Sequence, residues 1–257
     1  MTGKVYLIGA GPGAADLITV RGAELLKRAG IVFYDALVLP DMLALAPQAR
    51  HVAVGKRCSR ISTDQRFINR NLIEAAAKYD IVVRLKGGDP MLFGRAQEEI
   101  ESLKAAGVAF EVVPGVTSAL AASAELEVSL TGRGVSRSVV FATPRIGEGE
   151  DVSDWAPAVA RADTAVLYMA VGQAAEIAAV LQAHGMPIST PVVLVENASL
   201  PHSQHVGTTL QGLKNGAAQV LAGPALLLFG EVFRKRAHAL IGQDLLTDTE
   251  PPLAVPR

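Results

Sequence analysis

The sequence contains a single cysteine, Cys58, few aromatic residues (5%) and no excess of charge of either sign. One cysteine excludes an intrachain disulfide, and the lack of a CxxC pair or a Cys/His cluster argues against a zinc site. With 24 basic and 25 acidic residues, the chain lacks the basic excess that is typical of nucleic-acid-binding proteins. We therefore expect a cytoplasmic protein that binds neither a metal ion nor nucleic acid.

The sequence also lacks a hydrophobic run long enough to cross a membrane. The longest uncharged stretch, residues 177–195, contains Gln182, His184, Gly185 and two prolines, which is typical of a helix end, a turn and a strand. The N-terminal residues begin directly with a strand pattern and do not show the charged, apolar and cleavage regions of a signal peptide. We expect no membrane association and no cleaved leader.

Half of the residues are hydrophobic, and short apolar runs alternate with helical patterns along the chain. This alternation predicts βαβ units around a mainly parallel sheet, that is, an α/β fold. Turn residues at Pro114-Gly115 suggest a domain junction, which gives an N-terminal domain of residues 1–114, a C-terminal domain of 115–243 and a loose tail of 244–257. The predicted strands are Lys4–Gly9, Ile31–Tyr34, Ile81–Leu85, Phe110–Val113, Ser138–Ala142, Thr164–Met169, Val192–Glu196 and Ala225–Phe229, with an antiparallel pair within 203–213. The predicted helices are Leu17–Ala29, Asp64–Tyr79, Arg95–Ala106, Ala119–Ala124 and Gln173–His184.

A glycine-rich turn follows the first predicted strand, with Gly9, Gly11 and Gly13 in the segment GAGPG. Such glycines let a ligand approach the backbone closely. Gly9, Gly11 and Ala14 also satisfy the loose dinucleotide fingerprint, and Asp35 follows the second strand at about the position of a ribose-binding acid. An NAD-binding oxidoreductase therefore stays an alternative. The proline inside the turn has no N–H group and removes one donor from a pyrophosphate cradle.

Two further turns of the same kind follow later strands. Gly87-Gly88-Asp89-Pro90 combines two bare backbone positions with a carboxylate, and the segment 113–118 combines Pro114 and Gly115 with two hydroxyl groups at the start of a helix. In α/β proteins the carboxyl ends of parallel strands form the edge at which ligands bind. Three such turns therefore predict one ligand-binding rim.

Seven segments match the tetrapyrrole (corrin/porphyrin) methyltransferases in order and spacing. They are VYLIGAGPGAADLITVRGAELL, the pair Tyr34-Asp35, VGKR at 54–57, RLKGGDPMLFGR, EVVPGVTSA, YMA at 168–170 and ENAS at 196–199. The chain thus resembles this family over nearly its whole length. The resemblance implies two α/β domains with S-adenosyl-L-methionine in the cleft between them, and a homodimer.

The resemblance also implies an activity, which is transfer of methyl groups from S-adenosyl-L-methionine to two ring carbons (C2 and C7) of uroporphyrinogen III. The products would be precorrin-2, formed via precorrin-1, and S-adenosyl-L-homocysteine. By the same resemblance, an acid/base pair falls on Asp35 as proton acceptor and on Lys56 as proton donor or charge stabiliser. The implied cofactor-binding residues are Pro12, Gly87, Gly88, Asp89, Leu92, Thr117, Ser118, Met169, Ala198 and Ala225.

The implied tetrapyrrole carries many carboxylates, and arginine binds carboxylates through two parallel hydrogen bonds. Candidate substrate-binding residues are Arg57, Arg95 and Arg133, and Arg60, Arg137 and Arg145 also fall in or beside predicted loops.

The chain departs from the family pattern at three places. Gly132 and the pair Pro144-Arg145 replace residues that often are histidine and Gly-His, and Arg95-Ala-Gln replaces Arg-Gly-Gly. Because these positions fall where the family meets its tetrapyrrole, a later corrin precursor is an alternative substrate, and a non-catalytic tetrapyrrole carrier is a further alternative. The first strand begins at Lys4, so we expect the methyltransferase module without a preceding dehydrogenase/chelatase module.

Overall fold

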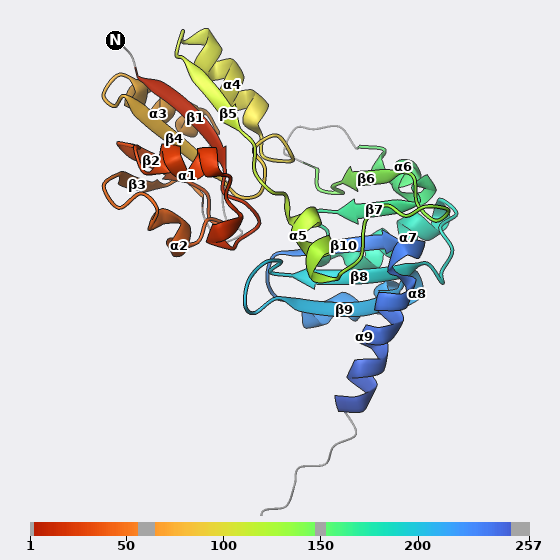
Figure 1. Ribbon diagram of the computed structural model, residues 1–257. Coiled ribbons are helices and arrows are strands. Elements are labelled where there is room, and N and C mark those ends of the chain that lie inside the picture. The colour runs from red at the N-terminus through yellow and green to blue at the C-terminus, as the bar shows by residue number, and fades with distance from the viewer. Residues whose placement is uncertain (1–2, 56–64, 147–152, 248–257) are drawn as a thin grey trace, which may run out of the picture. The chain divides into compact units, whose positions relative to one another are not determined.

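A computed structural model describes residues 3–55, 65–146 and 153–247 of the chain. The chain divides into two compact units, Met1–Ala121 and Ala122–Arg257. Each unit is built on a five-stranded sheet of its own (Figure 1).

The sheet of the first unit is entirely parallel. Its strands are β1 (Lys4–Gly9), β2 (Ile31–Tyr34), β3 (Arg50–Ala53), β4 (Ile81–Lys86) and β5 (Phe110–Val113), in the order β3-β2-β4-β1-β5. Because parallel strands all end at the same edge, the segments that follow β2, β4, β1 and β5 lie along one rim. This rim carries Asp35 and the three glycine turns.

Helices cover both faces of this sheet, as a buried parallel sheet requires. On one face, Ile8, Val32 and Leu85 pack with Leu26 of α1 (Val20–Leu26) and Met42 of α2 (Pro40–Leu43). On the other face, strand residues including Leu7, Phe33 and Val82 pack against α3 (Gln65–Ala76) and α4 (Ala96–Ala105). The alternation of side chains along each strand thus fills two separate cores.

The sheet of the second unit is mixed. Its strands are β6 (Val139–Ala142), β7 (Thr164–Leu167), β8 (Pro191–Glu196), β9 (Gln204–Thr209) and β10 (Ala225–Gly230), in the order β6-β7-β10-β8-β9. β6 is parallel to β7, whereas β10 is antiparallel to β7 and β8, and β9 is antiparallel to β8. The first residue of β10 therefore lies at the edge where β7 and β8 end.

Helices also cover the second sheet. Val159 of α6 (Trp155–Arg161), Ile177 and Leu181 of α7 (Ala174–Ala183) and Leu213 of α8 (Leu210–Lys214) form one core with the strands. α9 (Arg234–Thr247) packs closely on β9 at Gly207. A Cβ atom there would clash with the carbonyl oxygen of Ala237, so the absence of a side chain permits this approach.

Several element predictions need correction. The first helix begins at Val20, not at Leu17, because residues 15–17 form a 3₁₀ turn and the Thr19 side chain caps α1 by accepting a hydrogen bond from the Gly22 N–H. The segment 203–213 contains one strand, β9, followed by α8, rather than an antiparallel pair. β3, α2, α6 and α9 were not predicted.

The chain is divided between Ala121 and Ala122, within α5 (Ser118–Glu125), a few residues after the predicted junction at Pro114-Gly115. The reason is that Gly115 packs against Gly9 and Gly88 and donates its N–H to Asp89, which ties the whole turn to the first unit. At the other end, α9 continues to Thr247, past residue 243.

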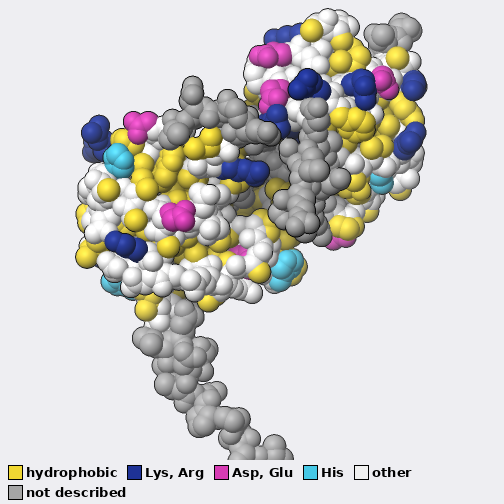
Figure 2. Space-filling view, turned by 180° about the vertical axis from the view of Figure 1, so that it is seen from behind, with side chains coloured by type: hydrophobic (Ala, Val, Ile, Leu, Met, Phe, Trp, Pro, Cys, Tyr) yellow, Lys and Arg dark blue, Asp and Glu magenta, His cyan; other side chains and the backbone are white. Residues whose placement is uncertain are grey.

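The surface seen in Figure 2 carries side chains of both charge signs on each unit, with hydrophobic side chains between them. This distribution agrees with the formal net charge of −1. Within the described ranges, no helix combines the length and the apolar character needed to cross a membrane.

Candidate active site

The three glycine turns of the first unit contact one another. Gly11 and Gly88 form an isolated antiparallel bridge, in which the Gly88 N–H donates to the Gly11 carbonyl at 2.7 Å and the Gly11 N–H to the Gly88 carbonyl at 3.2 Å. A Cβ atom on Gly9 would lie 2.5 Å from the Gly115 Cα and 2.7 Å from the Gly88 oxygen. The predicted meeting of the turns is therefore confirmed, and only glycine backbone fits where they cross.

The turn at Gly88 leaves bare backbone facing open space. Gly88 has a φ of +65°, and a Cβ atom there would meet only one neighbour within 4 Å, the Thr117 Cα at 3.9 Å. Thr117 and Ser118 are half-buried at the start of α5, and Pro12 is half-buried in the first turn. This arrangement can receive a ligand against backbone atoms of two turns.

Asp89 links the second turn to the third. Its Oδ2 accepts from the Gly115 N–H at 2.9 Å, and its Oδ1 accepts from the Met91 N–H at 2.8 Å. The carboxylate thus holds the rim together, and its remaining lone pairs stay available to a ligand. Leu92 lies three residues further on, half-buried, with its N–H bonded to the Asp89 carbonyl.

The strand order argues against a dinucleotide site. In the classic dinucleotide-binding fold the first strand lies beside the second, but here β4 lies between β1 and β2. The fingerprint also requires a helix that opens at the glycine turn, whereas α1 begins only at Val20 and the Gly11 N–H is already bonded to Gly88. The turn therefore does not form the pyrophosphate cradle that an NAD-binding protein needs.

Gly9 should tolerate no side chain. We expect Gly9→Ala to lower the free energy of unfolding by about 1–3 kcal/mol, because overpacking a tight contact forces the backbone apart. Gly172→Ala is the control, since a Cβ atom there meets nothing within 4 Å. Urea unfolding followed by circular dichroism measures both, and equal midpoints for the two variants would contradict the crossing geometry.

Asp35 follows β2 at the same rim and lines a small cavity. Its side chain is 29% exposed, and its Oδ1 accepts a hydrogen bond from Nη2 of buried Arg84 at 2.5 Å. The cavity measures about 290 Å³. It is lined by Tyr34, Asp35, Ala36, Val38, Pro40, Leu43 and Gly55.

A further group of predicted residues gathers at one edge of the second sheet. Ala225 pairs with the last residue of β8, Glu196, so it lies beside the turn that holds Ala198. Met169 follows β7 at the same edge, with a φ of +55° and a side chain that is about half exposed, and its sulfur lies 4.0 Å from Nη1 of Arg145. The structure brings Met169, Ala198 and Ala225 together within this unit.

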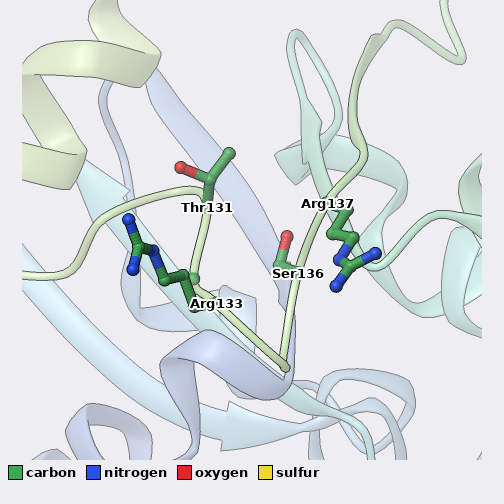
Figure 3. Close-up of a pocket in the computed structure, with 5 residues that line it drawn as sticks. Thr131, Arg133, Ser136 and Arg137 are labelled. Carbon is green, nitrogen blue, oxygen red and sulfur yellow. The ribbon is translucent and has the colours of Figure 1, made fainter.

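A second cavity, of about 490 Å³, lies in the second unit and is lined by Thr131, Gly132, Arg133, Ser136 and Arg137. Gly132 and Ser136 form a bridge that closes the loop, and the hydroxyl of buried Ser136 contacts the Leu130 carbonyl and the Thr164 hydroxyl. Figure 3 shows the two arginines on opposite arms of this loop, with their guanidinium groups well apart.

The sequence matches the family described as Tetrapyrrole (Corrin/Porphyrin) Methylases over residues 4–214. The chain belongs to this family. It is 42% identical to the uroporphyrinogen-III C-methyltransferase of Pseudomonas aeruginosa, over 91% of this chain and 96% of that protein.

Other relatives are longer than this chain. It is 43% identical to the siroheme synthase of Zymomonas mobilis, over 90% of this chain but 49% of that protein, so it spans about half the length of several curated relatives that it matches. Among solved structures, the uroporphyrin-III C-methyl transferase from Thermus thermophilus complexed with S-adenyl homocysteine is 41% identical, with a TM-score of 0.81 over 91% of this chain and all of that one.

The structure describes only some of the predicted basic residues of the site. The guanidinium of Arg95, the residue before α4, is held by Glu98 of that helix through bonds of 2.6 and 2.8 Å, so it is engaged within the protein. Lys56, Arg57 and Arg60 lie outside the described residues.

The loop that carries Arg133 and Arg137 is anchored by Asp163. Its Oδ2 accepts from the backbone N–H groups of Arg137 and Ser138 at 2.9 and 3.0 Å, and from the Ser138 hydroxyl at 2.9 Å. These bonds lower the pKa of Asp163 below its usual value of 3.8, and the bond from the Arg137 N–H has the largest effect.

A carboxyl group whose pKa is lower in the folded state stabilises the fold above its unfolded pKa, and loses this contribution as pH falls through the folded pKa. We therefore expect Asp163→Asn to be less stable than the parent protein at neutral pH, with the difference vanishing as pH falls below about 3.8. Thermal unfolding against pH measures this, and a difference that does not depend on pH would contradict it.

Sequence reasoning missed the buried charges beneath the rim. Arg84, Lys86 and Glu99 are each less than 5% exposed and are joined by ion pairs. A signal was present, because Glu99 has Ala96 and Leu103 as its i−3 and i+4 neighbours on the apolar stripe of the predicted helix.

Proposed function

We propose that this tetrapyrrole methylase transfers methyl groups from S-adenosyl-L-methionine to ring carbons C2 and C7 of uroporphyrinogen III, giving precorrin-2 via precorrin-1. The observation that carries the proposal is the crossing of three bare-backbone turns at the sheet edge that also carries Asp35. The similarity to a uroporphyrinogen-III C-methyltransferase over nearly its full length supports the choice of substrate.

The rim offers backbone and hydroxyl groups to the proposed cofactor. S-adenosyl-L-methionine, when bound, supplies an electrophilic methyl group on a sulfonium sulfur and leaves as S-adenosyl-L-homocysteine. The open side of Gly88 and the half-buried Thr117 can contact its polar groups through backbone and hydroxyl atoms. The contacts proposed in the first unit are Pro12, Gly87, Gly88, Asp89, Leu92, Thr117 and Ser118, and those in the second unit are Met169, Ala198 and Ala225.

Asp35 is the proposed proton acceptor. Methylation of an electron-rich pyrrole carbon forms a C–C bond with the ring's electron pair and leaves the ring cationic, so a ring proton must depart to restore neutrality. Asp35 is partly exposed, lines a cavity and accepts a hydrogen bond from the buried Arg84 guanidinium. General base catalysis of this kind typically contributes about 10²–10⁴-fold. Lys56 is proposed as the donor or charge stabiliser.

Arg133 and Arg137 are proposed to bind carboxylates of the tetrapyrrole. Their guanidinium groups are separated across the cavity shown in Figure 3, which suits two different carboxylates of one large ligand. Arg57 and Arg95 remain weaker candidates.

The protein is proposed to act in the cytoplasm as a homodimer. Light scattering after size exclusion tests the dimer, because a particle of one chain's mass, 26.9 kDa, would rule it out at the concentration used.

Incubation with methyl-labelled S-adenosyl-L-methionine tests the reaction. The full chain should transfer two labelled methyl groups to each uroporphyrinogen III and fewer or none to a later corrin precursor. Transfer only to the later precursor would shift the substrate, and binding of both ligands without transfer to either would favour a carrier protein.

A further inference from the structure

Beneath the rim of the first unit lies a cluster of buried charges. Arg84 and Lys86 project from β4 onto the face covered by α3 and α4, where both form ion pairs with Glu99 of α4. The Arg84 Nε donates to Glu99 Oε1 at 2.9 Å, and the Lys86 Nζ donates to Glu99 Oε2 at 3.0 Å. Gln65 of α3 adds a bond to Oε1 at 3.2 Å. Glu99 itself is fully buried.

Burying these groups is costly. Burial, with the neighbouring Arg84 cation, lowers the pKa of Lys86 despite its pairing with Glu99. Replacing a buried ion pair by apolar residues of similar volume is often neutral or stabilising. The same face does use apolar residues at Val82 and Leu103. A structural role alone therefore gives little reason for the charged pair at positions 84 and 99.

Arg84 joins the cluster to Asp35 at the rim. Arg84 uses all three nitrogens of its planar guanidinium, with Nε on Glu99, Nη1 on the Leu85 carbonyl at 3.2 Å and Nη2 on Asp35. A planar group fixed at three points has no freedom to rotate. The position of the Asp35 carboxylate is thus set from below by Arg84, and that of Arg84 by Glu99.

We propose that Glu99 is a positioning residue, which acts through Arg84 to hold the Asp35 carboxylate toward the adjoining cavity. The proposal rests on the proposed role of Asp35 as proton acceptor. Glu99 is fully buried beneath the rim, so the proposed role acts through Arg84 and not through direct contact with a ligand. Loss of its contact with Arg84 lets the guanidinium and Asp35 move together, and a displacement of about 1 Å at a reacting group can cost about 10²-fold in rate.

The test uses Lys86→Met as the reference, because removing Glu99 alone would leave an unpaired buried lysine and destabilise the fold. In this reference Glu99 still holds Arg84, and we expect kcat within about threefold of the parent. Adding Glu99→Met should lower kcat at least about tenfold, while KM for uroporphyrinogen III and the Kd for S-adenosyl-L-homocysteine change by less than about threefold. Adding Glu99→Gln instead keeps an acceptor for the Arg84 Nε and should restore kcat to near the reference.

Several outcomes would overturn the proposal. They are an unchanged kcat in the Glu99→Met/Lys86→Met protein, an equal loss in the Met and Gln versions, or a loss of activity that follows thermal unfolding. Asp35→Ala in the same assay separates the two claims. If that variant keeps full turnover, the role of Asp35 itself is wrong, whereas if it loses turnover and the Glu99 variants do not, only the positioning proposal fails.

Discussion

Replacing Asp35 with alanine is expected to lower kcat for methyl transfer by about 10²–10⁴-fold, the usual contribution of a general base. The affinity for S-adenosyl-L-homocysteine should change by less than about threefold, because Asp35 follows β2 and the cofactor turns follow β4, β1 and β5. Steady-state kinetics with uroporphyrinogen III and calorimetric titration with S-adenosyl-L-homocysteine measure the two effects.

The matched control is Asp80→Asn, an exposed carboxylate just before β4, at the far end of the same strands. It should leave both quantities unchanged. A large loss of S-adenosyl-L-homocysteine affinity in Asp35→Ala, with little loss of kcat, would move Asp35 from the proton-transfer step to the cofactor site.

The second large effect is expected at Gly88. Gly88→Ala places a methyl group where only the Thr117 Cα lies within 4 Å, in the space proposed for the cofactor. We expect S-adenosyl-L-homocysteine to bind at least about tenfold more weakly, which is about 1.4 kcal/mol. The side chain also strains a backbone of positive φ by about 1–2 kcal/mol.

Gly107→Ala is the control that separates the effect of backbone strain from the effect of filling the proposed ligand space. Gly107 has nearly the same φ, +66° against +65°, but a Cβ atom there would meet nothing within 4 Å, and the residue follows α4, away from the rim. Both variants should lose similar stability, and only Gly88→Ala should lose affinity. Equal affinities for the two would mean that no ligand occupies the space at Gly88.

The fold was largely predictable because its strands are short, apolar and bounded by turn residues. β1, β2 and β5 begin and end at the predicted residues. β3, RHVA, has only two apolar residues and is largely exposed at the sheet's edge, so its sequence gives a weak strand signal. The insertion of β4 between β1 and β2 is a long-range pairing choice that local pattern does not encode, and it is the feature that argues against the dinucleotide interpretation.

The site was predictable where backbone chemistry decides it. Gly9, Gly88 and Gly115 could be placed at one rim because parallel strands end together, and their mutual contact follows. The cluster of buried charges could not be predicted in the same way, since the bond between Glu99 and Arg84 joins a helix to a strand through tertiary packing. The engagement of Arg95 by Glu98 depends likewise on side-chain geometry.

The central claim is that three crossing glycine turns hold a sulfonium nucleoside and not a dinucleotide. The most direct measurement is a calorimetric titration of the full chain with S-adenosyl-L-homocysteine and, separately, with NADH. We predict saturable one-site binding of S-adenosyl-L-homocysteine and no binding of NADH. Tight binding of NADH, with none of S-adenosyl-L-homocysteine, would contradict it.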